Sequence, residues 1–314
     1  MLRIAIVAMT LLLISALPAR AALCSVDIGT LDFAQVDTLG DTATLTGTPV
    51  TIHCDGVTPG ETLVTVCGSL GAGSGGAVGG LRRALSGDET LGFILSVTDG
   101  GGVPWGSLSA PELGAPRTIT LNVDQENHTA SRIVQLYGVV PEGQSAAPVG
   151  AYSADFNGAD ASFTYDEGDL DCNVQSGSGD ASVSFTVTAS VAANCRLETS
   201  DLNFGTTGKI GDNIDGETAM SILCTAGTGY GIAIDGGGSG DTANRRLVAG
   251  ENSVRYDLYS NSQRSARWGM DEGDMVNGDG DGTAQQYWVY GRIPPQPAAT
   301  GAYTDTVVVT LFYE

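Results

Sequence analysis

Short apolar runs rich in β-branched residues alternate with clusters of Gly, Asp and Asn along the chain after residue 21. No long window repeats its apolar residues with the 3.6-residue period of an amphipathic helix. The runs predict strands, and the 45 glycines in 314 residues predict many tight turns. The expected strands are Thr42–Thr46, Val50–Ile52, Leu63–Val66, Thr118–Val123, Ile133–Tyr137 and Ser162–Tyr165 in the first half, and Tyr230–Ile234, Ser253–Tyr259, Gln286–Tyr290 and Thr304–Tyr313 in the second.

Residues Ser182–Val191 carry the most regular alternation in the chain. Their apolar side chains would face one side of a strand and their serines and threonines the other, which is typical of a half-buried strand. Two placements are open. The strand completes the first half of the chain, or its final residues, Ala189–Val191, form the first strand of the second half.

The amino terminus has the features of a secretory signal peptide. Arg3 precedes the almost wholly apolar stretch Ile4–Leu17, and Ala19-Arg20-Ala21 has the small-x-small pattern of a cleavage site. Residues 1–21 are therefore expected to be removed on export. No later segment reaches the ~20 consecutive apolar residues that a membrane helix needs.

Export would place the six cysteines in an oxidising compartment, and their even number favours complete pairing. Metal ligation is the competing interpretation, but the chain has no Cys-x-x-Cys and only two histidines. We expect three disulfides and no metal site. The spacing of Cys24 and Cys54 nearly equals that of Cys195 and Cys224, which leaves Cys67 and Cys172 for each other.

The formal net charge of -22 narrows the range of partners. A field of this sign repels phosphate backbones and anionic lipid headgroups, so nucleic acid is not an expected partner. The acidity is best explained by solubility outside the cell.

An internal repeat divides the chain. The stretch CSVDIGTLDFAQVD, from Cys24, returns as CRLETSDLNFGTTG, from Cys195. The later landmarks follow in the same order: Arg82-Arg83 and Arg245-Arg246, Trp105-Gly106 and Trp268-Gly269, Tyr137-Gly138 and Tyr290-Gly291, Gly150-Ala151-Tyr152 and Gly301-Ala302-Tyr303. Because the arginines and tryptophans recur, we expect them to serve a shared fold rather than a ligand. With a usual domain size of ~100–150 residues, the repeat predicts a signal peptide (1–21) and two domains (22–175 and 176–314).

These landmarks together resemble the spore coat protein U domain family, which also provides the subunit fold of archaic chaperone–usher pili. The motifs are a cysteine followed by L-[DN]-F-[GA], then R-R, W-G, Y-G-x-[IV]-P and G-x-Y-x-D-T. The second half matches them more closely than the first, which ends in the looser GAYSADFNGADASFTYD. The resemblance implies an all-β fold of two immunoglobulin-like β-sandwich domains in tandem, the second incomplete and completed by donor-strand complementation.

The resemblance also implies a function. Single-domain members of the family carry a donor extension before the first cysteine, whereas only Ala22 and Leu23 precede Cys24 in the expected mature chain. A subunit that accepts a strand but donates none belongs at the pilus tip, with an adhesive head followed by a pilin-type adaptor. The expected role is surface attachment and biofilm formation at the cell surface, after transit through the periplasm. A structural spore-coat or extracellular-matrix protein is the alternative.

The expected partners are a periplasmic pilus chaperone, an outer-membrane usher, a neighbouring pilin subunit and an unknown surface or receptor. The final run of the chain is apolar on both faces, as a central strand would be, and no later strand covers its edge. The expected acceptor-groove residues are Val307, Val309, Leu311 and Tyr313, and those of an internal donor strand are Val183, Phe185 and Val187.

Two segments of the first half, 68–80 and 100–116, lean towards small and apolar residues without the charge of the remaining surface. Exposed apolar patches on exported proteins are often binding sites, and flexible connectors are the alternative. The candidate adhesive residues are Leu70, Val78, Val103, Pro104 and Leu108.

Catalysis and cofactors are not expected. His53, at the end of a strand, and His128, in a polar loop, leave few options for a general base. Residues Asn277–Gly282 alternate oxygen-bearing side chains as the first half of a calcium loop does, but the bidentate glutamate of that motif is missing. A solvated turn is the favoured interpretation, with weak calcium binding by Asp279 and Asp281 as the alternative.

Overall fold

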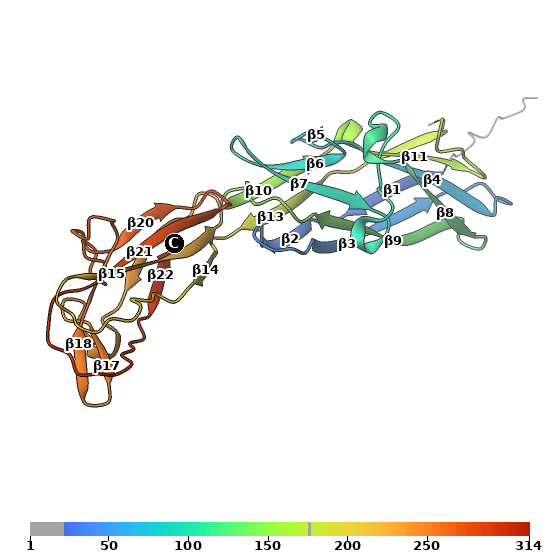
Figure 1. Cartoon of the computed structure of the whole chain (residues 1–314). Coiled ribbons are helices and arrows are strands. Elements are labelled where there is room, and N and C mark those ends of the chain that lie inside the picture. Colours follow the sequence, from blue (N-terminus) through green and yellow to red (C-terminus); the bar gives the residue numbers. More distant parts are fainter. Residues whose placement is uncertain (1–21, 175–176) are drawn as a thin grey trace, which may run out of the picture.

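The structure, a computed structural model of the chain, describes residues 22–174 and 177–314. The expected signal peptide, residues 1–21, lies outside the described residues. Figure 1 shows two β-sandwiches that follow one another end to end. We call residues 22–191 the first sandwich and residues 195–314 the second sandwich. The described helical elements are short 3₁₀ turns, η1 (Asp99–Gly101), η2 (Pro111–Leu113), η3 (Gly158–Asp160) and η4 (Gly237–Ser239), and none could cross a membrane.

The first sandwich is built from thirteen strands. Along the sheet they follow the order β12-β11-β4-β8-β9-β7-β6-β10-β13-β2, while β3 pairs with both β1 and β9, and β5 with β6. The bounds are β1 (Leu23–Ile28), β2 (Leu31–Val36), β3 (Thr44–Asp55), β4 (Leu63–Leu70), β5 (Ala77–Val78), β6 (Leu81–Ser86), β7 (Glu89–Ser96), β8 (Arg117–Asp124), β9 (Thr129–Val140), β10 (Gly150–Phe156), β11 (Ala161–Glu167), β12 (Gly179–Ser182) and β13 (Phe185–Val191).

The expected strands of the first half are present, with one difference. Thr42–Thr46 and Val50–Ile52 were expected separately, but a single strand, β3, covers both. The cause is its partner, because β3 stays paired with β9 from Thr44 opposite Val140 to Asp55 opposite Thr129.

The second sandwich has smaller sheets. One follows the order β14-β15-β21-β19, a second β20-β16-β22, and β17 pairs with β18. The bounds are β14 (Cys195–Thr199), β15 (Ile214–Cys224), β16 (Gly229–Ile234), β17 (Arg246–Ala249), β18 (Asn252–Arg255), β19 (Asp257–Tyr259), β20 (Val276–Asp279), β21 (Ala284–Ile293) and β22 (Val309–Tyr313).

The last strand differs from the expectation. A strand over Thr304–Tyr313 was expected, with a free edge that no later strand covers. Only Val309–Tyr313 forms β22, and β22 lies at the edge of its sheet. Residues 304–308 are not part of a strand, because the strand that would pair with them has no counterpart among the described residues of this sandwich.

The disulfides are the three pairs that the spacing predicts. Cys24–Cys54 joins β1 to β3, Cys195–Cys224 joins β14 to β15, and Cys67–Cys172 ties β4 to the segment before β12. The first two occupy the same place in each sandwich, and the third is found in the first sandwich alone among the described residues.

A buried arginine occupies the same position in both sandwiches. The guanidinium of Arg82 donates to the carbonyl oxygens of Leu70, Gly71 and Trp105 at 2.7 to 2.8 Å. Arg245 does the same, at 2.8 Å, with the carbonyls of Ile234, Asp235 and Trp268. Burial lowers the pKa of Arg82 to about 10 and also lowers that of Arg245. The recurring arginines therefore hold the shared fold through backbone carbonyls.

The recurring tryptophans are equally structural. Trp105 and Trp268 are buried, and their indole N–H groups donate to the carbonyls of Gly68 and Ile232 at 2.8 and 2.9 Å. Together with the arginines, they give a residue-by-residue correspondence between the two sandwiches.

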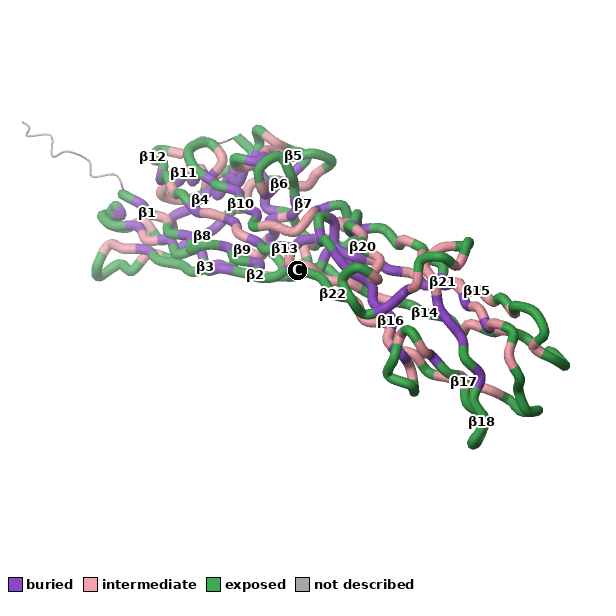
Figure 2. The backbone as a smooth tube through the Cα atoms, turned by 90° about the vertical axis from the view of Figure 1, so that its left-hand side faces the viewer, coloured by how far each residue is buried: buried purple, intermediate pink, exposed green. Residues whose placement is uncertain are grey.

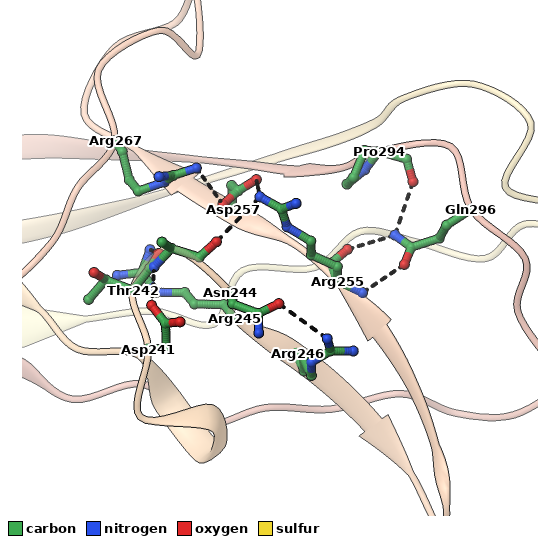
Figure 3. A network of polar contacts seen from close by, with 11 residues as sticks. Asp241, Thr242, Asn244, Arg245, Arg246, Arg255, Asp257, Arg267, Pro294 and Gln296 are labelled. Carbon is green, nitrogen blue, oxygen red and sulfur yellow. Dashed lines mark hydrogen bonds and ion pairs between the residues drawn. The ribbon is translucent and has the colours of Figure 1, made fainter.

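Figure 3 shows the polar surroundings of Arg245. The buried carboxylate of Asp257 lies between Arg255, at 3.5 Å, and Arg267, at 3.2 Å. The side chain of Gln296 accepts from the backbone N–H of Arg255 and donates to its carbonyl, both at 2.8 Å. These contacts stabilise the region of β18 and β19.

The two sandwiches meet through a short connection. The N–H of Val149 donates to the carbonyl of Ala226 at 2.9 Å, and Arg196 lies 3.4 Å from the carboxylate of Asp37. Figure 2 shows buried segments throughout the first sandwich and more intermediate and exposed backbone in the second.

Candidate functional site

Strand β13 fills a position inside the first sandwich between β10 and β2. It pairs antiparallel with β10, from Phe185 opposite Phe156 to Val191 opposite Gly150, and parallel with β2. Just before it, β12 pairs antiparallel with β11. The segment 179–191 thus lies along the strands of 150–167. The sequence leaves two placements open for this strand, and the structure has it in the first sandwich. The domain boundary expected from the sequence, 175/176, lies before it.

The apolar face of β13 belongs to the first core. Phe185, Val187, Ala189 and Val191 are all buried, and Val183 packs against the same core while partly exposed. The ring of Phe185 stacks on that of Phe156 with 4.7 Å between centroids. Burying a large apolar side chain contributes about 1.5–3 kcal/mol. β13 is therefore a major part of this core.

The polar face of β13 is also held in place. Thr188 donates to the Asp32 carboxylate at 2.9 Å, and Thr186 donates to that of Asp155 at 2.9 Å. Ser190 adds a hydrogen bond to the carbonyl of Ala34 at 3.0 Å. The alternation seen in the sequence therefore matches one apolar and one hydrogen-bonded face.

Matched contacts show which residues of the second sandwich occupy the equivalent place. The hydroxyls of Tyr152 and Tyr303 each donate to the carbonyl four residues earlier, at 2.7 and 2.9 Å. Ser153 pairs with β6 as Thr304 pairs with β17. A Cβ added to Gly138 would meet Leu31 and Phe33, and one added to Gly291 would meet Leu202 and Phe204. Residues 301–307 therefore correspond to β10, and residues 202–207 to β2.

Neither of these two segments forms a strand in the second sandwich. No described strand lies between residues 202–207 and residues 301–308 in the way that β13 lies between β2 and β10. β22 is paired on one side only, with β16. We call residues 202–207 and 301–313 the open edge. Leu202, Phe204, Tyr303 and Val307 are partly exposed there, whereas their counterparts Leu31, Phe33, Tyr152 and Phe156 are buried.

The residues expected to line an acceptor groove lie on the open edge. Val307, Val309 and Leu311 are partly buried against the second core. Tyr313, at the end of β22, is 42% exposed, and Phe312 and Val308 are 48% and 57% exposed. Val307 itself precedes the strand. The four expected groove residues thus lie on one segment of the chain, and their apolar side chains remain partly exposed to solvent.

Two carboxylates, which sequence reasoning missed, hold the open edge in place. Asp305 accepts from the hydroxyl of Tyr256 at 2.7 Å and from the N–H of Gly238 at 2.9 Å. Asp235 accepts from the N–H of Val308 at 2.8 Å. Burial, and then the hydrogen bond to Asp305, raise the pKa of Tyr256, so its hydroxyl stays a donor. The D of the G-x-Y-x-D-T motif was the available signal, but its partner lies 49 residues away.

The structure corrects one of the candidate adhesive residues. Leu70 is 0% exposed, because β4 continues through it and its side chain lies in the core, so it cannot contact a surface. Val78, Val103 and Leu108 are 64%, 52% and 38% exposed, and Pro104 is exposed as well. Figure 1 shows β5, which contains Val78, on the flank of the first sandwich.

His53 lies in a row of three polar side chains on the first sandwich. The His53 ring lies 2.6 Å from the Ser131 hydroxyl and 3.1 Å from the Asp55 carboxylate, an order that resembles a hydrolytic triad. The side chains of His53 and Asp55 are 45% and 66% exposed on an open strand face. His128 adopts a positive φ in the turn before β9. Among the described residues no group of three or more metal-ligating side chains gathers.

The repeated arginine, tryptophan and disulfide positions agree with a comparison of the sequence with known families. The model described as Spore Coat Protein U domain matches twice, over residues 9–156 and 181–310. The chain belongs to the spore coat protein U domain family. The second match to the family begins at residue 181, so by sequence the β13 segment belongs to the second repeat, whereas in space it lies in the first sandwich.

A solved structure of similar fold supports the architecture. One chain of the chaperone–tip adhesion subunit pre-assembly complex from the archaic chaperone–usher Csu pili of Acinetobacter baumannii matches with a TM-score of 0.54 and 18% identity, over 93% of this chain and 99% of that one. The CupB6 tip adhesin from Pseudomonas aeruginosa matches with a TM-score of 0.40 and 13% identity, over 93% and 95% of the two chains. No curated protein matches this sequence.

Proposed function

We propose that the protein is the adhesive tip subunit of a chaperone–usher pilus and that the open edge is its strand-acceptor groove. The observation that carries this proposal is the contrast between matched positions. The first sandwich holds a strand of its own chain between β10 and β2, and the second has no described strand in the same place.

The occupant of the groove is an extended segment of another chain. Unpaired strand edges bind extended segments through backbone hydrogen bonds, and pockets for alternate side chains give specificity. The first sandwich supplies the template, since segment 179–191 lies antiparallel to 150–167 with its apolar side chains in the core. A periplasmic chaperone fills the groove during transit, and a neighbouring pilin subunit fills it after passage through the outer-membrane usher.

A terminal position follows from the use of β13. In the family, the segment before the first cysteine of a pilin is the one donated to a neighbour. Here the segment before Cys195 is already part of the first core. The second repeat therefore accepts a strand while its own is used within the chain. The matched Csu structure, described as a chaperone–tip adhesion subunit complex, shares its fold with this chain over 93% of this chain and 99% of that one.

The first sandwich is then the adhesive head. Its exposed apolar side chains Val78, Val103, Pro104 and Leu108 are the candidate contacts for a surface or receptor. Attachment through them would support biofilm formation at the cell surface.

The proposal is tested by deleting the gene and scoring pilus formation separately from attachment. A tip adhesin predicts attachment close to zero and assembled or partly reduced pili, restored by the wild-type gene. A variant with Val309→Asp and Leu311→Asp should complement neither, because the groove could not accept a strand. Normal surface display in strains lacking the chaperone and usher would contradict the proposal and favour a coat or matrix protein.

A further inference from the structure

The open edge differs chemically from its filled counterpart at one position. In the first sandwich, Phe93 packs edge-on against Phe33 at 6.3 Å, and Ala154 of β10 is fully buried. In the second sandwich, Tyr256 packs edge-on against Phe204 at 6.1 Å. The hydroxyl of Tyr256 donates to Asp305. At the two matched positions of the first sandwich the residues, Phe93 and Ala154, are both apolar.

The correspondence of these residues rests on the buried arginines. Arg82 is paired with Phe93 across β6 and β7, and the N–H of Tyr256 donates to the carbonyl of Arg245 at 3.1 Å. Asp305 lies four residues after Gly301, and Ala154 lies four residues after Gly150, so the two residues occupy the same place in their repeats.

The residue that faces this position is known in the first sandwich. Val187 of β13 is directly opposite Ala154, and both are fully buried. Directly opposed residues of an antiparallel pair have Cβ atoms about 4.5–5.5 Å apart, so their side chains touch. A strand that fills the open edge in the same register places one side chain against the carboxylate of Asp305.

That carboxylate has room for one more donor. Asp305 accepts from the Tyr256 hydroxyl through Oδ2, and from the N–H groups of Gly238 and Thr306 through Oδ1. An ionised carboxylate offers about four acceptor sites. An apolar side chain would cover the carboxylate without supplying a fourth hydrogen bond, and burying an unsatisfied acceptor site is unfavourable. A short side chain with a hydroxyl or amide would supply it.

We propose, resting on the proposed function, that the strand accepted by the second sandwich carries Ser, Thr or Asn opposite Asp305. Asp305 is then a specificity determinant of the groove. The chain's own β13 sequence, with Val187 at this position, fits the first sandwich and is selected against by the second.

The test uses the full mature chain and two fluorescent synthetic peptides. One has the sequence of residues 179–191, GDASVSFTVTASV, and the other carries Val187→Thr. Binding is measured by fluorescence anisotropy, with a Phe185→Asp peptide as the negative control. The wild-type chain should bind the threonine peptide at least tenfold more tightly than the valine peptide, which corresponds to about 1.4 kcal/mol.

Two protein variants and a control complete the experiment. Asp305→Ala should abolish or reverse the preference, and Asp305→Asn, which keeps the size and the acceptor oxygen, should reduce it. Thr306→Ala, at an exposed neighbouring position, should keep it. Equal affinities for the two peptides would overturn the inference while leaving the proposed function intact. If neither peptide binds, the strand-acceptor function itself is contradicted.

Discussion

The two sandwiches share their disulfide, their buried arginine and their buried tryptophan, yet one is closed and the other is not. In the first, β13 supplies four buried side chains between β10 and β2. In the second, the equivalents of β10 and β2 are not strands, and their apolar residues are partly exposed. The comparison shows that the recurring landmarks set the architecture, and that one strand decides whether the core is complete.

The polar residues of the open edge account for its shape in the absence of a strand. Asp235 and Asp305 accept hydrogen bonds from the backbone of Val308 and Gly238, so the segment before β22 is held close to the core. In the first sandwich the residues that match Asp235 and Asp305 are Gly71 and Ala154, which have no carboxylate. There the matching segment, β10, is held by its pairing with β13. The open edge is thus supported while it remains unpaired.

The largest effect is expected from a charge in β13. Val187→Asp places an unpaired carboxylate in the first core, where the side chain is 0% exposed, and the first sandwich should fail to fold. Val308→Asp, at a position of the open edge that is 57% exposed, is the matched control and should leave folding almost unchanged. Limited proteolysis of the secreted protein measures both. A protease-resistant first sandwich in V187D would show that β13 is dispensable.

The next largest effect concerns the disulfide that the first sandwich alone contains among the described residues. Cys67 and Cys172 are separated by 105 residues, and the chain-entropy model gives about 4.7 kcal/mol for a loop of that order, against about 3.6 kcal/mol for one of about 30 residues. Replacing both cysteines by alanine should lower the unfolding free energy of the first sandwich only.

The same replacement of Cys195 and Cys224, which are 29 residues apart, should destabilise the second sandwich by a smaller amount. Calorimetry that resolves the two transitions provides the measurement. A larger loss from the second replacement would show that the longer bridge adds little to the first sandwich.

The buried arginines should be equally important in both sandwiches. Arg82→Met and Arg245→Met each remove the donors to three matched carbonyls, and we expect each sandwich to lose about 3 kcal/mol. Arg246→Met is the control, since Arg246 is exposed. Urea denaturation of each variant tests this, and unequal losses well beyond 1 kcal/mol would contradict the one-to-one correspondence.

Much of this architecture can be predicted from the sequence, because the repeat exposes it. The nearly equal spacings of Cys24–Cys54 and Cys195–Cys224 predict the disulfides, and the alternation in Ser182–Val191 predicts β13. Leu70 was misplaced because it stands at the start of a glycine-rich run, GSLGAGSGG, although β4 continues through it. Periodicity shows which face is apolar, but it does not show where pairing with a neighbour ends.

The hydrogen bond between Tyr256 and Asp305 at the open edge could not be predicted from periodicity or spacing. Tyr256 and Asp305 lie 49 residues apart, and only the fold brings the hydroxyl to the carboxylate. The strand expected over Thr304–Tyr313 is shortened for a related reason, since a strand needs a partner as well as a suitable sequence.

The smallest effect on stability is expected at the exposed loops of the first sandwich. Replacing Val78, Val103 and Leu108 by serine should change the unfolding free energy by no more than about 0.5 kcal/mol per site while reducing attachment strongly. Leu70→Ala, in the core, should instead cost about 2–5 kcal/mol. Attachment of cells and Tm of the purified variants are the readouts. Undiminished attachment in the triple variant would place the adhesive surface elsewhere on the head.

The central claim is that one sandwich is completed by its own chain and the other awaits a strand, and amide hydrogen exchange tests it most directly. On the free full-length protein, mass spectrometry should show strong protection of residues 150–156 and faster exchange of residues 301–308, because the former are paired with β13 along their whole length and the latter meet a described strand only at Thr304. A bound donor strand should bring residues 301–308 to comparable protection. Equal protection of both segments in the free protein would contradict the account.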